Sequence, residues 1–243
     1  MSRLIKDDYE RLIQFLKEYS LLDLIKYDDF LNLLSQQHKH YYALLIFLAE
    51  LKHQDFDPTA IYGSQHSDLK QQFFDYLEES ISDVGTAFFV CLHGCYKASG
   101  QILRSSIENF IKAIGSVESP EIIKQKNMNL IMEIASKTKF YQDDEAKKLF
   151  SELKANYSEL CKTVHTATVQ DMQHITALGY FPTFNITKAN QIKSRLTRIS
   201  KNYISTLTIY SPNAVKSMYH NHSDIILKML PRNIKRKIME LES

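Results

Sequence analysis

The segment YKASGQILRSSIENFIKAI, residues Tyr96–Ile114, carries the pattern that decides the fold class. Its apolar residues recur every three or four positions, which is the spacing of one face of an α-helix. They are Ile102, Leu103, Ile107, Phe110 and Ile111. Polar and charged residues lie among them, so the segment predicts a helix over Gln101–Ile114 that buries one face and holds charges at its edge.

The composition extends this prediction to the rest of the chain. Only 6 Gly and 5 Pro occur among 243 residues. All-β folds need many turns, and turns need these residues, so their scarcity favours long helices. Hydrophobic residues make up 44% and charged residues 24%, as in ordinary globular proteins. The sequence therefore predicts an all-α helical bundle, with one large domain or one domain and an appendage.

Apolar periodicity and helix-start residues outline the other helices. Asp83 is expected to start one of them, and the chain is expected to break or bend near Gly100. The expected ranges are Asp7–Tyr19, Tyr27–Leu34, Lys39–His53, Asp68–Ser80, Val84–Ala98, Glu121–Lys137, Asp143 to about Ala167, Thr187–Tyr210, Ser211–Leu230 and Arg232–Leu241.

A loop divides the predicted helices into groups. Residues 54–67 contain Pro58, Gly63 and several short polar residues, which are typical of a loop. We therefore expect three parts: an N-terminal helical appendage over 1–60, a helical core over 67–185, and basic C-terminal helices over 187–243 that pack on that core.

Cysteine use and hydropathy limit the classes of protein. Three cysteines, Cys91, Cys95 and Cys161, cannot form a disulfide framework and suit a reducing, cytoplasmic location. Cys91 and Cys95 resemble a zinc pair only loosely, and two small buried residues explain them better. The charged first residues indicate no signal peptide, and the apolar runs are too short to span a bilayer. We expect no membrane association, no metal and no cofactor.

Charge is unevenly distributed along the chain. Residues 1–83 hold 8 basic and 15 acidic residues, whereas residues 187–243 hold 11 basic and 3 acidic ones. The candidate binding residues in the basic region are Lys193, Arg195, Arg198, Lys201, Arg232, Lys235 and Arg236. Three interpretations stay open: RNA or DNA binding through phosphates, binding of an acidic protein surface or of a second copy, and a solvated face without a specific partner.

Three polar residues form a candidate catalytic site. Arg104 and Glu108 are four residues apart and therefore share a helix face. His165 follows the half-apolar segment Tyr157–Val164, and antiparallel packing of the two helices would bring all three side chains to one pocket. An Arg–His pair suits a phosphate or a scissile bond. Alternatively, Arg104 and Glu108 form a structural ion pair, and His165 is a C-terminal helix residue favoured by the helix dipole.

Two short motifs resemble the HEPN-like superfamily of prokaryotic helical proteins. They are Ile102-Leu103-Arg104 with Glu108, similar to L-L-R-x-x-x-E, and Tyr157–His165, with the pattern Y-x-x-L-x-x-x-V-H. The resemblance covers residues 68–180. It implies a bundle of about four to five helices, frequent dimers, and a place in phage-defence, abortive-infection or toxin–antitoxin systems. Active members of the superfamily are metal-independent ribonucleases.

The sequence departs from that superfamily at its nuclease motif. The family motif places an Arg before a His on one helix, whereas no Arg occurs in residues 157–164 before His165. Three hypotheses follow: a HEPN-like defence protein that binds a protein partner, RNA or both; a metal-independent ribonuclease with a rearranged site of Arg104, Glu108 and His165; and a structural or regulatory helical subunit unrelated to defence.

Overall fold

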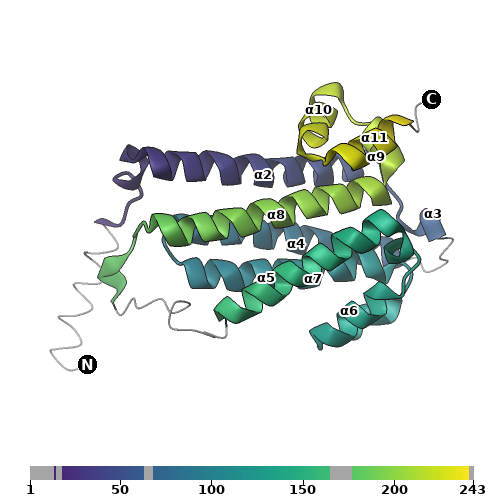
Figure 1. Cartoon of the computed structure of the whole chain (residues 1–243), viewed down its shortest axis with the longest axis horizontal. Helices are drawn as coiled ribbons and strands as arrows, with labels where there is room; N and C mark the ends of the chain where they lie inside the picture. Colours follow the sequence, from purple (N-terminus) through teal and green to yellow (C-terminus); the bar gives the residue numbers. More distant parts are fainter. Residues whose placement is uncertain (1–13, 15–17, 63–67, 165–176, 241–243) are drawn as a thin grey trace.

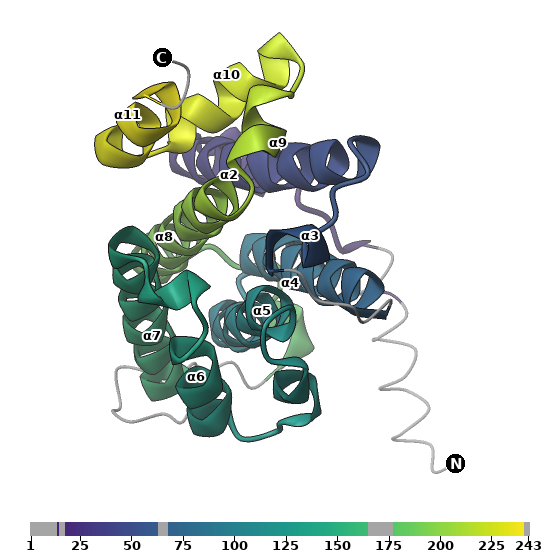
Figure 2. The same cartoon turned by 90° about the vertical axis from the view of Figure 1, so that its right-hand side faces the viewer.

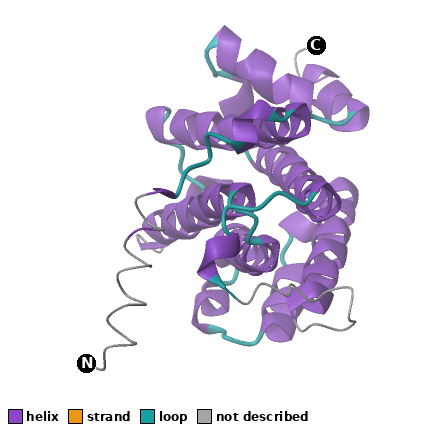
Figure 3. Ribbon diagram, turned by 90° about the vertical axis from the view of Figure 1, so that its left-hand side faces the viewer, coloured by secondary structure: helices purple, strands orange, loops and turns teal. Residues whose placement is uncertain are grey.

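The described part of the protein is helical. The structure is a computed structural model that describes residues 14, 18–62, 68–164 and 177–240. Within these ranges the regular secondary structure consists of helices, and no strand occurs (Figure 3). The prediction of an all-α bundle is confirmed. The expected helix Asp7–Tyr19 falls almost wholly on residues outside the described ranges.

Long helices are joined by short helical turns. The α-helices are α2 (Asp28–His53), α3 (Thr59–Tyr62), α4 (Asp68–Leu92), α5 (Tyr96–Ser116), α6 (Met128–Ser136), α7 (Asp144–Val164), α8 (Ile186–Tyr210), α9 (Pro212–Lys216), α10 (His220–Met229) and α11 (Arg232–Glu240). The 3₁₀ turns are Leu24–Lys26, Pro120–Lys124, Phe140–Gln142 and Leu178–Tyr180.

The long helices run side by side along the molecule (Figure 1). Helices α4 and α5 form a helical hairpin, and α5 also contacts α6, α7 and α8. Seen end-on, α5 lies between α4 and α7 (Figure 2). Helix α2 packs on α8, and α9 to α11 gather at one end of these two helices (Figure 1). The segment that decided the fold class thus lies in the middle of the bundle.

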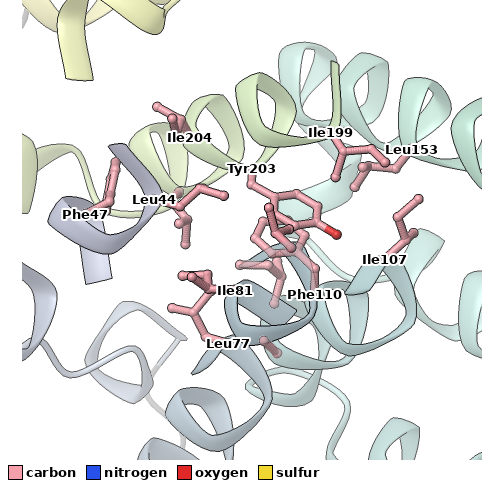
Figure 4. Packing of buried hydrophobic residues seen from close by; sticks show 14 of the residues in the cluster. Leu44, Phe47, Leu77, Ile81, Ile107, Phe110, Leu153, Ile199, Tyr203 and Ile204 are labelled. Carbon is pink, nitrogen blue, oxygen red and sulfur yellow. The ribbon is translucent and has the colours of Figure 1, made fainter. Parts of the chain in front are cut away.

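The core of the bundle lies where α5 and α8 meet. The rings of Phe110 and Tyr203 stack there with centroids 3.8 Å apart and planes 9° apart (Figure 4). Residues 202–208 of α8 are all buried, because other helices surround this half of α8. The C-terminal half of α8 is therefore part of the centre of the bundle.

The break between α4 and α5 occurs at Gly94. Its φ of +84° is a conformation that side-chain-bearing residues avoid, and a Cβ there would lie 2.3 Å from the carbonyl oxygen of Thr183. The sequence-based expectation of a break at Gly100 was wrong. Gly100 lies inside α5, where a Cβ would make ordinary contacts with the side chains of Leu160 at 3.7 Å and Ile192 at 4.0 Å.

Several expected boundaries differ from the observed ones. Helix α2 is continuous across the gap expected between residues 34 and 39, and α4 is continuous past Asp83. Asp83 accepts a hydrogen bond from the Asn109 side chain at 3.1 Å and so does not cap a helix. Pro120 opens a 3₁₀ turn, and Asn127 caps the following α6. The expected helix over Ser211–Leu230 is divided into α9 and α10.

Two helix starts agree with the sequence reading. The carboxylate of Asp143 accepts hydrogen bonds from the backbone N–H groups of Glu145 at 3.1 Å and Ala146 at 3.2 Å. The side chain of Asn185 accepts from the N–H of Lys188 at 3.0 Å. Such caps satisfy the free donors of a first turn, so α7 and α8 begin where the sequence predicts.

One hydrophobic cluster extends over the described residues. It includes Leu24 and Phe30 near the start and Ile234 and Ile238 near the end of the chain. Helix α2 shares this cluster with α4, α5 and α8. The described part of residues 1–60 therefore buries its apolar face in the common core, and the three-part division of the chain stays a prediction.

Candidate functional site

Arg104 and Glu108 form an ion pair on α5, as their spacing predicts. The guanidinium Nε of Arg104 lies 3.3 Å from Oε1 of Glu108. The two side chains are 31% and 28% exposed, so the pair lies at the edge of the core and remains open to solvent. The apolar residues on either side place it there, since Leu103 and Ile107 are fully buried.

Helix α7 adds Tyr157 to this pair. Its hydroxyl donates a hydrogen bond to Oε1 of Glu108 at 2.9 Å, the same oxygen that faces Arg104. The guanidinium carbon of Arg104 lies 5.6 Å from the centre of the Tyr157 ring, within the range of a cation–π interaction. The carboxylate of Glu108 thus holds together one side chain from its own helix and one from α7.

The electrostatics of this cluster define its chemistry. Partial burial, the negative charge of Glu108 and the hydrogen bond to that carboxylate raise the pKa of Tyr157 above its usual value. Tyr157 is therefore a hydrogen-bond donor at neutral pH and does not act as a base. The part-exposed guanidinium of Arg104, oriented by Glu108, can bind an anion such as a phosphate.

Helices α5 and α7 run antiparallel, as the candidate catalytic site requires. Glu108 contacts Tyr157, and Gly100, two turns earlier in α5, faces Leu160, which comes later in α7. Helix α7 ends at Val164. His165, the third candidate, lies outside the described residues, so the structure brings together Arg104 and Glu108 and leaves the place of His165 open.

The basic residues of α8 differ in their surroundings. Arg198 pairs with Glu159 of α7 through Nη2 and Oε2 at 2.8 Å, with both side chains about half exposed. Lys201 is exposed and has no ion pair or hydrogen bond within the described residues. Lys193 and Arg195 are half-buried. Glu159 of α7 therefore neutralises Arg198, whereas Lys201 has no such partner within the described residues.

The segment before α11 lies near two basic residues of α8. Arg232 and Arg236 are exposed, and Lys235 is half-buried. Pro231, directly before α11, lines the same surface hollow as Arg198 and Lys201. Arg198 and Lys201 of α8 and the residue before α11 thus border the same hollow.

Acidic residues hold the C-terminal helices on the bundle. At the start of α7, Glu145 accepts a hydrogen bond from Asn233 at 2.7 Å, and Asp143 lies 3.5 Å from the ammonium of Lys237. At the end of α2, the buried carboxylate of Glu50 contacts the imidazole of His222. Some of the acidic residues in the first two thirds of the chain therefore pair with residues of the basic C-terminal region within the protein.

Metal-ligating side chains do not cluster in the described residues. No group of three or more His, Cys, Asp and Glu side chains able to hold a metal occurs in the described ranges. Cys91 is buried, and Cys95 is half-buried. In the same ranges, no helix has the length and apolar character needed to cross a membrane.

Sequence reasoning missed the contributions of α7. Tyr157 was part of the motif Tyr157–His165, yet only the tertiary contact assigns it a partner. Asn156 and Asn202, buried polar residues beside the basic face, also escaped notice. A polar residue at a buried helix position is a signal of this kind, since such a group needs a partner.

Comparisons with protein-family models, with curated proteins and with solved structures found no match to this chain.

Proposed function

We propose that this chain is a HEPN-like helical binding protein of a bacterial defence or toxin-type system, and that it holds RNA through its basic face. The basic face is the set of cations on α8 and α11. It comprises Lys193, Arg195, Arg198, Lys201, Arg232, Lys235 and Arg236. The observation that carries the proposal is that α8 contains five basic residues and no acidic one, and that Pro231, directly before the basic residues of α11, lines the same hollow as Arg198 and Lys201.

Cations in this arrangement suit a phosphate backbone. Each Lys or Arg that contacts a phosphate releases counterions, so affinity depends strongly on salt. Arginine adds a planar fork that can bind phosphate oxygens in pairs. Arg195 and Arg198 are three residues apart on α8 and therefore project to the same side of the helix. The defence context is supported by the resemblance of the two short motifs to HEPN-like proteins.

Reversing two charges on α8 is expected to weaken RNA binding about tenfold or more, because two phosphate contacts are lost and two repulsions added. The variant is Arg195→Glu with Arg198→Glu. Binding of a fluorescently labelled single-stranded RNA is measured by anisotropy over a range of salt concentrations. The variant should also show a shallower dependence of the binding constant on salt.

The matched control changes net charge by the same amount elsewhere. Lys124→Glu with Lys126→Glu alters two exposed lysines of the Pro120–Asn127 segment, away from α8 and α11. RNA affinity equal in both variants would mean that only net charge matters and would remove the basic face from the proposal. An acidic protein partner or a second copy, which the same cations suit, is the competing possibility if RNA is not bound at all.

A second candidate function is a metal-independent ribonuclease. The observation in its favour is the cluster of Arg104, Glu108 and Tyr157, which offers an oriented, part-exposed guanidinium beside a carboxylate. A phosphate bound to Arg104 would lie near Tyr157, whose hydroxyl donates its hydrogen bond to Glu108. The general base of such a site would have to be His165.

Removing the imidazole distinguishes the two candidates. If the protein is a binding protein, we expect no RNA cleavage in a chelator-containing buffer, and His165→Ala should bind RNA like the wild-type protein. Labelled RNA is incubated with each protein and resolved on a denaturing gel. Cleavage by the wild-type protein that disappears in His165→Ala, and also in Arg104→Ala, would establish the ribonuclease instead.

A further inference from the structure

A surface hollow of about 320 Å³ lies between α7 and α8 and is also lined by Pro231, directly before α11. Leu149, Glu152 and Asn156 line it from α7, and Lys201, Asn202 and Ser205 line it from α8. Leu149, Glu152 and Asn156 are three and four positions apart on α7, and Lys201 and Asn202 lie four and three positions before Ser205 on α8, so each set lies on one side of its helix. Its size is that of a small-molecule site, and its lining combines the apolar residues Leu149, Ala155 and Pro231 with polar and charged ones.

Asn156, which lines this hollow, has a buried acceptor without a partner within the described residues. Its side chain is 6% exposed, and Nδ2 donates a hydrogen bond to the backbone oxygen of Glu152 at 2.8 Å. Because a carbonyl oxygen can only accept, this bond fixes the orientation of the amide. The other atom, Oδ1, has no hydrogen-bond partner within the described residues. A buried acceptor of this kind is stabilised when a donor reaches it.

Ser205 repeats this situation one helix away. Its side chain is 1% exposed, and its hydroxyl has no hydrogen-bond partner within the described part of the chain. Asn202, between the two helices, is by contrast satisfied. Its Nδ2 donates to the backbone oxygen of Leu149 at 2.9 Å and to Oε2 of Glu152 at 3.3 Å. The hollow therefore combines two unsatisfied polar groups with one side chain that connects its walls.

The hollow also holds two charges of opposite sign that are not paired. Lys201 forms no ion pair within the described residues, and neither does Glu152. Arg198 and Glu159, at the end of the same hollow, neutralise each other at 2.8 Å. A ligand that carries only a negative charge would be repelled by Glu152. A ligand that carries only a positive charge would be repelled by Lys201. A ligand that carries both charges can satisfy both residues.

We propose that this hollow binds a small zwitterion of the α-amino-acid class. The ligand's ammonium donates to Glu152, and its carboxylate accepts from Lys201. An apolar side chain packs against Leu149, Ala155 and Pro231. The inference rests on the hollow and its two unpaired charges, and it holds whether or not the basic face binds RNA.

The first test varies the charges of the ligand. L-leucine, L-valine and L-phenylalanine are titrated into the full chain by calorimetry at low ionic strength and up to millimolar concentrations. The amino acid that binds most tightly is then compared with its analogues lacking the amino group or the carboxyl group. For L-leucine these are 4-methylpentanoate and 3-methylbutylamine. We expect each analogue to bind at least about tenfold more weakly, since each loses one charged contact.

The second test varies the charges of the protein. Lys201→Met should lower the affinity for the amino acid to that of the analogue without a carboxyl group, and Glu152→Gln should lower it to that of the analogue without an amino group. Each variant should bind its corresponding analogue as the wild-type protein does. Lys124→Met, which removes an exposed lysine outside the hollow, should bind like the wild-type protein, and thermal unfolding checks that all variants are folded.

Three results would overturn the inference. They are no saturable binding of any of the three amino acids, equal binding of an amino acid and its two analogues, and unchanged binding in both Lys201→Met and Glu152→Gln. None of these results bears on RNA binding, because no RNA is present in the titrations. Conversely, loss of RNA binding in the Arg195 and Arg198 variant leaves the titrations interpretable.

Discussion

Replacing Tyr203 with alanine is expected to lower the free energy of unfolding by about 4 kcal/mol, the range for removing a large aromatic side chain from a core. Tyr203 is fully buried at the centre of the bundle and stacks on Phe110 (Figure 4). Its removal leaves a cavity between α5 and α8, since the surrounding helices relax only in part. Urea unfolding followed by circular dichroism measures the change.

Tyr203→Phe provides the matched control, because it keeps the ring and removes only the hydroxyl. That hydroxyl lies 2.9 Å from Oγ of Ser106, and Ser106 retains a second hydrogen bond, donated to the backbone oxygen of Ser80 at 2.8 Å. We expect a loss of about 1 kcal/mol, typical of one buried hydrogen bond. If both variants lose the same free energy, stacking on Phe110 does not stabilise the bundle as proposed.

Lowering the pH from 7 to 5 is expected to reduce the free energy of unfolding by about 2 kcal/mol through His40 alone. His40 is 5% exposed on α2. Burial, and then the positive charges of Lys201 and Lys39, lower its pKa to about 4 from the usual 6.5. The unfolded chain therefore binds a proton in this range that the folded chain does not. The stabilisation is present above pH 6.5 and is lost as the pH falls toward 4.

Urea unfolding at pH 7, 6 and 5, for the wild-type protein and for His40→Leu, measures this dependence. The variant should be less sensitive to acid, since it has no imidazole to protonate. Lys201→Met should reduce the sensitivity only in part, because burial is the larger cause of the shift. Equal pH dependence in the wild-type protein and His40→Leu would show that His40 is not the group responsible.

The acid range below pH 5 involves a different residue. Burial opposes ionisation of Glu50, but hydrogen bonds from His222 and Gln54 and the charge of His222 hold the pKa of Glu50 below its usual value. The stabilisation of the folded state by ionised Glu50 is present at pH values above the usual carboxyl pKa. It is lost only as the pH falls below that pKa. Measurements between pH 7 and 5 therefore report on His40 without a large contribution from Glu50.

Local signals in the sequence predicted the helices well where helix caps mark their ends. The start of α7 after Asp143 and the whole of α8 were expected within one residue of the observed bounds. The ion pair of Arg104 and Glu108 follows from helical spacing alone. The signals failed between residues 34 and 39 and at Asp83, because a polar residue inside a long buried helix looks like a helix start when its neighbours are unknown.

The sequence could group candidate site residues that lie on one helix, but not those that come from two helices. Arg104 and Glu108 could be grouped because they share one helix, whereas the partnership of Glu108 with Tyr157 joins residues 49 positions apart. The hollow between α7 and α8 likewise depends on Asn156 meeting the face of Lys201 and Ser205. No spacing rule along a single chain predicts which faces of two separate helices come together.

The sequence by itself determined that the chain forms helices, which face of each helix is apolar, and where most of its charge lies. These properties depend on neighbours three or four positions away. Only the tertiary structure decided that α8 is surrounded by other helices, that Tyr157 joins Arg104 and Glu108, and that Lys201 faces a hollow with unsatisfied polar groups. The reason is physical: the apolar faces can be buried in several arrangements, and the close packing of particular side chains such as Phe110 and Tyr203 selects one of them.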